Sequence, residues 1–149
     1  MSTKIEAKLS HHLKAAPERV YDAWLDPEQV RQWMEASLKS FGLVGDIRRI
    51  EIDPHVGGKF FFSDMRGEIE AKHWGTYQQL ARPHKIVFTW IVDVADEADP
   101  SRVTLALMPD GGGCLATLVH EMDAKWAEYI SRTEAGWSRM LSEIDRLLS

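Results

Sequence analysis

The pattern that most restricts this fold lies at the C-terminal end of the chain. Between residues 125 and 148, apolar side chains recur at steps of four and three, which predicts one long amphipathic helix. A helix with one apolar face must cover that face with another layer of structure. The preceding segments have strand character, so we expect the helix to pack on a sheet. The predicted inward positions are Trp126, Ile130, Thr133, Trp137, Leu141, Ile144 and Leu148.

The N-terminal segment predicts a strand followed by two short helices. Residues 5, 7, 9, 11 and 13 share one face of an alternating segment, with polar residues between them, as in a strand with one buried side. Pro17 and Pro27 each suit the first position of a helix. Asp26 is placed as an N-cap, and Gln29 is spaced to reach back toward it in a capping box.

A run of strands is predicted for the middle of the chain. Their expected ranges are 46–53, 59–63, 68–80, 85–92, 102–108 and 114–121. Turns at 54–58, 83–84 and 110–113 and an acidic loop at 93–100 separate them. Strands joined in this way form an antiparallel sheet. We therefore predict one α+β domain over residues 1–149, in which a curved antiparallel sheet wraps around the C-terminal helix.

The composition limits which partners the protein can bind and in which cellular compartment it is expected. The chain has 18 Lys and Arg against 23 Asp and Glu, a net charge of −5, which argues against nucleic acid as a partner. Cys114 is the single cysteine, so no intrachain disulfide is possible. Residues 1–13 lack the apolar run of a signal peptide, and no segment approaches the roughly 20 apolar residues of a membrane span. We expect a cytoplasmic protein.

Motifs for metal, phosphate or nucleophilic chemistry are not found in the sequence. His11 and His12 are adjacent on a predicted strand and point to opposite faces, and the remaining histidines are scattered. The glycine-rich turn at 110–113 lacks the lysine and helix of a phosphate loop. We interpret Cys114 as a half-buried filler residue. The prediction is therefore no catalytic residue, no metal and no organic cofactor.

The aromatic residues are the candidate binding group. They suit either an aromatic core or the walls of an apolar pocket in which Tyr77 and Thr133 orient a guest. Gly136 lies inside the predicted helix, where glycine costs about 1 kcal/mol relative to alanine, so packing or a ligand must need the space. The residues predicted to contact a ligand are Trp33, Phe60, Phe62, Trp74, Tyr77, Trp90, Trp126, Ile130, Thr133 and Trp137.

Several short strings, in order along nearly the whole chain, resemble one known family. They are Ala16 to Trp24 (APERVYDAW), Asp26-Pro27 with Trp33, Gly57-Gly58-Lys59-Phe60, Gly75-Thr76-Tyr77, Arg82-Pro83, Phe88-Thr89-Trp90, Leu118-Val119-His120, and Gly136-Trp137 with Leu141. The chain resembles the activators of heat-shock protein 90 ATPase, within the START-like (SRPBCC), birch-pollen-allergen-like superfamily. The resemblance implies a helix-grip fold with a cavity between the sheet and the long helix.

Three functions are compatible with this resemblance, because the superfamily includes lipid carriers, cyclases, hydrolases and co-chaperones. The first hypothesis is a module that binds a small apolar or aromatic molecule in the cavity. The second is a cyclase- or hydrolase-type enzyme that uses polar cavity groups such as His11, His120 or Tyr77. The third is a protein-interaction module that binds a chaperone.

Overall fold

The computed structural model describes residues 3–149 and places seven strands in one sheet. Their order across the sheet is β1-β7-β6-β5-β4-β3-β2, and every neighbouring pair is antiparallel. The predicted α+β architecture is confirmed. The strands are β1 Lys4–Leu13, β2 Asp46–Ile52, β3 Lys59–Arg66, β4 Ile69–Ala81, β5 Lys85–Trp90, β6 Ser101–Asp110 and β7 Gly113–Asp123.

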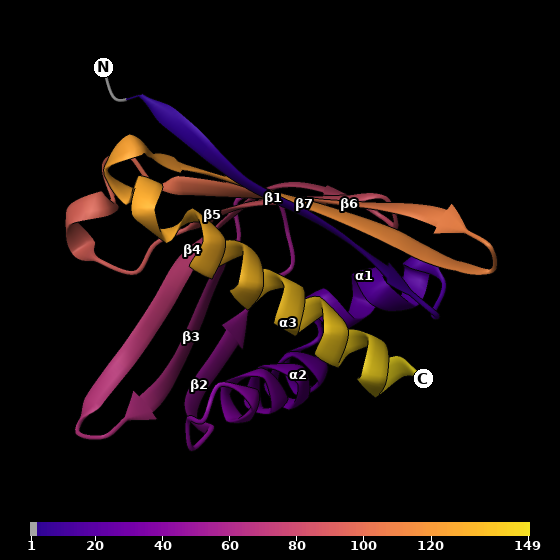
Figure 1. Ribbon diagram of the computed structural model, residues 1–149, viewed down its shortest axis with the longest axis horizontal. Helices are drawn as coiled ribbons and strands as arrows, with labels where there is room; N and C mark the ends of the chain where they lie inside the picture. Colours follow the sequence, from indigo (N-terminus) through magenta and orange to yellow (C-terminus); the bar gives the residue numbers. More distant parts are fainter. Residues whose placement is uncertain (1–2) are drawn as a thin grey trace.

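The sheet bends around the C-terminal helix. In Figure 1, β1, β7 and β6 form one side of the bend, β2 and β3 form the other, and α3 runs diagonally through the space between them. Helix α2 lies alongside α3 and β2. The helices are α1 Pro17–Leu25, α2 Pro27–Ser40 and α3 Ile130–Leu148, and two 3₁₀ turns are η1 Val94–Asp96 and η2 Ala124–Tyr129.

The bend is centred on β4, which pairs with β3 along its first half and with β5 along its second. The register against β5 shifts between Tyr77 and Gln79. Just before this shift, a Cβ atom at Gly75 would overlap the backbone carbonyl of Thr89. Glycine at this position therefore lets the two strands approach closely where the sheet turns.

Most of the predicted elements of the N-terminal segment are confirmed. In β1, Ala7 and Leu13 are fully buried while their neighbours are exposed, and the strand pairs with β7. Both short helices begin at their prolines. The capping box is wrong in detail, because the Asp26 carboxylate accepts a 3.0 Å hydrogen bond from the Gln29 side-chain amide and caps no backbone N–H.

The C-terminal helix begins later than its sequence predicts. The α-helix starts at Ile130, and residues 124–129 form the 3₁₀ turn η2. The side chain of Asp123 accepts a hydrogen bond from the Lys125 backbone N–H and opens that turn. Side chains three residues apart eclipse in a 3₁₀ turn, and the Trp126 and Tyr129 rings accordingly contact each other at 5.6 Å. Trp126 thus projects from η2 and not from the helix.

The core lies between α3 and the concave face of the sheet. Trp137, Leu141 and Ile144 are buried on the predicted inward face of α3. They meet fully buried strand residues such as Leu105 and Leu118. Among the helices of residues 3–149, none combines the length and apolar character needed to cross a bilayer.

Candidate functional site

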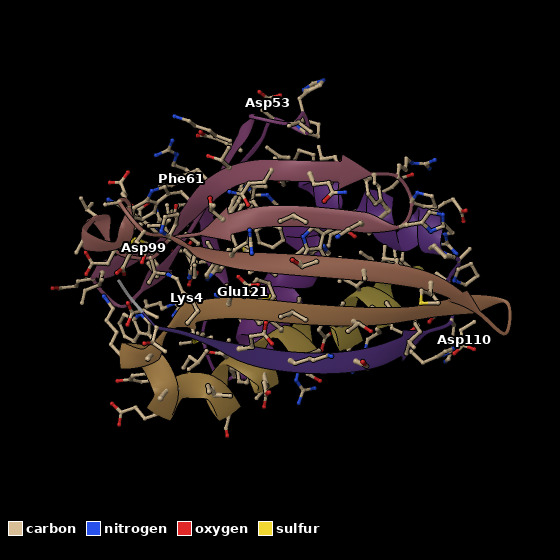
Figure 2. All side chains as sticks on the ribbon, turned by 90° about the horizontal axis from the view of Figure 1, so that it is seen from above. Lys4, Asp53, Phe61, Asp99, Asp110 and Glu121 are labelled. Atoms are coloured by element: carbon tan, nitrogen blue, oxygen red, sulfur yellow. The ribbon has the colours of Figure 1, made fainter. Side chains whose placement is uncertain are left out.

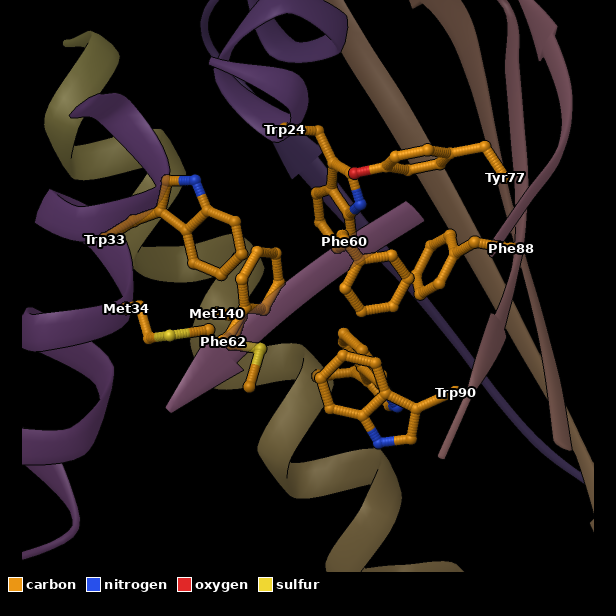
Figure 3. A pocket seen from close by; sticks show the side chains of 10 residues that line it. Trp24, Trp33, Met34, Phe60, Phe62, Tyr77, Phe88, Trp90 and Met140 are labelled. Atoms are coloured by element: carbon orange, nitrogen blue, oxygen red, sulfur yellow. The ribbon is translucent and has the colours of Figure 1, made fainter. Parts of the chain in front are cut away.

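An aromatic cluster fills the centre of the molecule, between α3, the two short helices and the middle strands (Figure 3). Neighbouring rings within it lie 5.0 to 6.4 Å apart, centroid to centroid. The remaining volume is only about 10 Å³, which is no more than one water molecule needs. The cluster consists of Trp24, Trp33, Met34, Phe60, Phe62, Tyr77, Phe88, Trp90, Trp137 and Met140.

Six of the ten predicted contact residues belong to this cluster, so the structure brings them together as packed neighbours. Trp33 illustrates the packing. Its ring is 3% exposed and lies 5.3 Å from that of Trp24, and its indole N–H donates a 2.9 Å hydrogen bond to the carbonyl of Ala23. Trp33 is therefore a buried part of the packed cluster. The six are Trp33, Phe60, Phe62, Tyr77, Trp90 and Trp137.

A buried hydrogen-bond chain links α3 to the sheet through His120. The indole N–H of Trp137 donates to His120 Nδ1 at 3.0 Å, so this nitrogen is an acceptor. Nε2 therefore carries the proton and donates to Ser101 Oγ at 2.9 Å, and the Ser101 hydroxyl donates to the carbonyl of Trp90 at 2.6 Å. Burial lowers the pKa of His120 to about 4. The imidazole is neutral near pH 7, and both its nitrogens are engaged in positioning the two tryptophans.

The other groups considered for catalysis do not converge on one place. Burial raises the pKa of the Tyr77 hydroxyl, and this residue lies inside the packed cluster. His11 is half-buried on the edge strand β1 and lies outside the cluster. Cys114 is fully buried, and burial raises the pKa of its thiol to about 11, so it is protonated near neutral pH.

A hollow of about 330 Å³ lies beside the cluster, and we call it the η2 hollow. The η1 loop, the ends of β5, β6 and β7, the η2 turn and the first turn of α3 form its walls. It includes three predicted contact residues, of which Trp90 also borders the aromatic cluster. The lining residues are Trp90, Val92, Ala95, Asp96, Ala98, Asp99, Ser101, His120, Met122, Asp123, Lys125, Trp126, Tyr129 and Thr133.

Two ion pairs fix the η1 loop at the rim of the η2 hollow. Lys125 Nζ lies 2.9 Å from Asp96, and Lys4 Nζ lies 2.9 Å from Asp99. Figure 2 shows Lys4 and Asp99 together at one end of the sheet, opposite the end that carries Asp110. The hydrogen bond to Asp96 raises the pKa of Lys125. These acidic residues are thus paired with lysines of neighbouring elements, which leaves the apolar and aromatic walls as the larger contact surface.

A second hollow of about 300 Å³ lies on the other side of Trp90, and we call it the α2 hollow. It extends between the C-terminal half of α2, strands β3 and β4, and α3. A Cβ atom at Gly136 would meet nothing within 4 Å beyond its chain neighbours and the backbone of its own helix, so the space expected at this glycine is open. The lining residues are Met34, Ser37, Leu38, Phe41, Leu43, Asp64, Arg66, His73, Trp90, Arg132, Ala135, Gly136 and Met140.

Two predicted contact residues lie apart from the cluster and from both hollows. Trp74 pairs with Phe61 across β3 and β4, and their rings stack at 6.4 Å on the face opposite Phe60 and Phe62. The guanidinium of Arg49 covers Phe61 at 4.0 Å. Ile130 is the half-buried first residue of α3. Strand alternation explains the outward position of Trp74, because adjacent strand residues point to opposite faces and its neighbour His73 points inward.

Sequence reasoning missed several lining residues. Trp24 stacks on Trp137 at 6.0 Å, and its helical spacing from Val20 was a usable signal of burial. His73 and Arg132, which line the α2 hollow, carry no comparable signal, because each lies in an ordinary polar context along its strand or helix.

The bent antiparallel sheet closed by a C-terminal helix defines the helix-grip class. The family model described as activator of Hsp90 ATPase homolog 1-like protein matches residues 14–149, so the chain belongs to that family. No curated protein matches the chain significantly.

Solved structures are similar over almost the full length. A protein from Chromobacterium violaceum is 23% identical, with a TM-score of 0.75 and coverage of 97% of this chain and 96% of that one. An Hsp90 activator from Plasmodium falciparum is 24% identical, with a TM-score of 0.69 and coverage of 97% and 96%. An AHSA1-like protein from Aeromonas hydrophila is 21% identical, with a TM-score of 0.72 and coverage of 95% and 90%. At these identities the likeness establishes the fold.

Proposed function

We propose that this protein binds a small, predominantly apolar or aromatic molecule in the η2 hollow. The observation that carries the proposal is the unfilled space of about 330 Å³ against Trp90 and Trp126, beside a cluster that is otherwise packed solid. Ligand pockets commonly measure about 300–1,000 Å³ and are lined mainly by apolar and aromatic groups. The volume therefore suits a compact guest of one or two rings.

Thr133 is the polar group best placed to orient the guest. Thr133 lines the η2 hollow, and its hydroxyl makes no hydrogen bond to any other residue in the described range 3–149. Ser101 and His120 also line the hollow, but their hydrogen bonds are already used within the chain from Trp137 to Trp90. We expect the guest to contact the two indoles and to exchange one hydrogen bond with Thr133.

The test is a titration with N-phenyl-1-naphthylamine, a neutral aromatic probe whose emission rises in apolar sites and is excited by energy transfer from tryptophan. Thr133→Leu places a larger side chain in the hollow and should raise the probe's Kd at least about tenfold, equivalent to 1.4 kcal/mol. Ser131→Leu is the matched control, because Ser131 is exposed on the same helix and should leave Kd within about twofold. Failure of the parent to take up the probe, or equal affinity in Thr133→Leu, would contradict the proposal.

A second candidate function is stimulation of a chaperone ATPase. The family match and the similar Hsp90 activator from Plasmodium falciparum favour it. Val92, just before η1, and Val94, its first residue, are 52% and 70% exposed and provide an apolar contact surface. We would measure ATP hydrolysis by Hsp90 with the parent and with the Val92→Ser, Val94→Ser double variant. This candidate is supported if the parent protein stimulates ATP hydrolysis and the double variant stimulates it less. It is eliminated if a saturating concentration of the parent leaves the Hsp90 ATPase rate unchanged.

A further inference from the structure

The α2 hollow contains a buried polar atom without a partner. Nδ1 of His73 is shielded from solvent and has no hydrogen-bond partner within residues 3–149. The imidazole stacks on Trp90 at 5.0 Å, centroid to centroid, with 26° between the planes. A buried polar group without a partner costs about 1–3 kcal/mol. A ligand that supplied the missing hydrogen bond would recover that free energy.

The same hollow carries a positive charge without a counter-ion. Arg132 lines the α2 hollow, and no carboxylate of the described residues lies within 4.0 Å of its guanidinium. In this conformation the guanidinium lies 5.5 Å from the ring of Tyr129, which lines the η2 hollow, so pairing with a guest in the α2 hollow requires the exposed Arg132 side chain to turn toward it. Arg66 differs, because it binds the buried Asp64 carboxylate at both oxygens, at 2.9 and 3.4 Å. The charges of Arg66 and Asp64 therefore compensate each other, which leaves Arg132 as the net charge of the lining.

The rest of the lining is largely apolar. Met34, Leu38 and Met140 surround the space, Trp90 forms one wall, and Gly136 leaves it open along α3. A molecule that enters the hollow thus contacts apolar walls, together with the guanidinium of Arg132 and the unsatisfied Nδ1 of His73. Arg132 supplies one uncompensated positive charge, so a second negative charge on the guest would lie unpaired in a largely apolar lining.

We propose that the α2 hollow binds an apolar molecule with one singly charged acidic head, a carboxylate or a sulfonate, which pairs with Arg132 and accepts a hydrogen bond from Nδ1 of His73. The guest selects the neutral imidazole tautomer that carries its proton on Nδ1. This site is separate from the η2 hollow, with which it shares Trp90, and the proposal stands whether or not that hollow is occupied.

Two matched probes test the assignment. 8-Anilinonaphthalene-1-sulfonate has the ring system of N-phenyl-1-naphthylamine with one added sulfonate, so a difference between the two reports on the negative charge. Both are titrated into the Thr133→Leu background, in which the η2 hollow is obstructed. Arg132→Gln should weaken sulfonate binding at least about fivefold and leave binding of the neutral probe within about twofold. Arg139→Gln, an exposed arginine on the same helix, is the control and should change neither.

The outcomes separate this proposal from that for the η2 hollow. Equal losses for both probes, no loss in Arg132→Gln, or no sulfonate binding at all would overturn the site. A loss of neutral-probe binding caused by the single substitution Thr133→Leu reports on the η2 hollow and not on the α2 hollow. His73→Phe keeps a ring against Trp90 and removes Nδ1, and it should weaken sulfonate binding with circular dichroism unchanged. If His73→Phe unfolds the chain, the Arg132 comparison still decides.

A carboxylate competitor tests the natural head group. Decanoate should displace the sulfonate probe from the parent at concentrations where decanol does not. The difference should disappear in Arg132→Gln. Equal displacement by the acid and the alcohol in the parent would overturn the assignment of an acidic head.

Discussion

The 3.0 Å hydrogen bond from the Trp137 indole N–H to Nδ1 of His120 joins α3 to β7 at the boundary between two differently packed parts of the helix. C-terminal to it, Leu141 and Ile144 are fully buried. N-terminal to it, Thr133 and Gly136 border open space on the two sides of Trp90. One half of the helix thus completes the core, while the other half bounds the two hollows.

The His120 chain makes stability depend on pH. The folded-state pKa of His120 is about 4, below the ordinary value of 6.5, so folding is favoured above pH 6.5 and loses this contribution as the pH falls toward 4. By pH 5 the loss is about 2 kcal/mol. Burial also lowers the pKa of His73 to about 4, so two histidines contribute to this loss. His120→Gln removes one of the two contributions and should make the loss of stability between pH 7 and 5, measured by urea unfolding, about 2 kcal/mol smaller than in the parent. The control, His84→Gln at an exposed turn, should keep the parent's slope; an equal slope in His120→Gln would show that burial does not perturb this histidine.

Trp33 should be among the residues that matter most for stability. Trp33→Ala removes a ring that is 3% exposed, together with its hydrogen bond to Ala23. We expect a loss of about 3–5 kcal/mol in the free energy of unfolding, measured with denaturant. Phe41→Ala, at a position that is 54% exposed, should change it by about 1 kcal/mol or less. An unchanged midpoint for Trp33→Ala would contradict the packing of the aromatic cluster.

Two glycines should respond to the same substitution in opposite directions. Gly136→Ala adds a methyl group to open space in mid-helix and should stabilise the fold by about 1 kcal/mol. Gly75→Ala drives a Cβ into the carbonyl of Thr89 and should destabilise it by at least about 2 kcal/mol. Thermal unfolding of both variants checks the pair. Destabilisation by Gly136→Ala would mean that the α2 hollow is filled.

Thr133→Leu should be tolerated. The added methyl groups enter the η2 hollow, so stability should remain within about 1.5 kcal/mol of the parent, against the 1–3 kcal/mol that overpacking a filled core costs. Chemical denaturation gives the value. An unfolded variant would place Thr133 in tight packing and would remove the η2 hollow as a binding site.

Much of the fold could be read from the sequence because its signals are local. The alternation of β1 identified Ala7 and Leu13 as buried, and the helical period identified Trp137, Leu141 and Ile144. The start of α3 could not be read, since a 3₁₀ turn also repeats apolar residues at short spacing, and the hydrogen bond from Asp123 decided between the two.

The hollows themselves could not be predicted. Each hollow is the space between backbone elements that the neighbouring side chains leave unfilled. Its volume depends on residues that lie far apart in the chain. Trp74 and His73 show the problem, because which of two adjacent residues faces inward depends on the register of β4 against β3. The sequence supplied the aromatic residues, and the tertiary packing decided that most of them fill the core.

The most direct test of the proposed binding site uses the indole N–H signals of the tryptophans in a ¹H–¹⁵N NMR titration with N-phenyl-1-naphthylamine, assigned by single Trp→Phe variants. Trp90 and Trp126 line the η2 hollow, whereas the Trp33 N–H is held by the carbonyl of Ala23 within the packed cluster. We predict saturable shifts for Trp90 and Trp126 and a nearly constant Trp33 signal. Shifts of Trp33 comparable to those of Trp126, or no saturable shift at Trp90 and Trp126, would contradict binding in the η2 hollow.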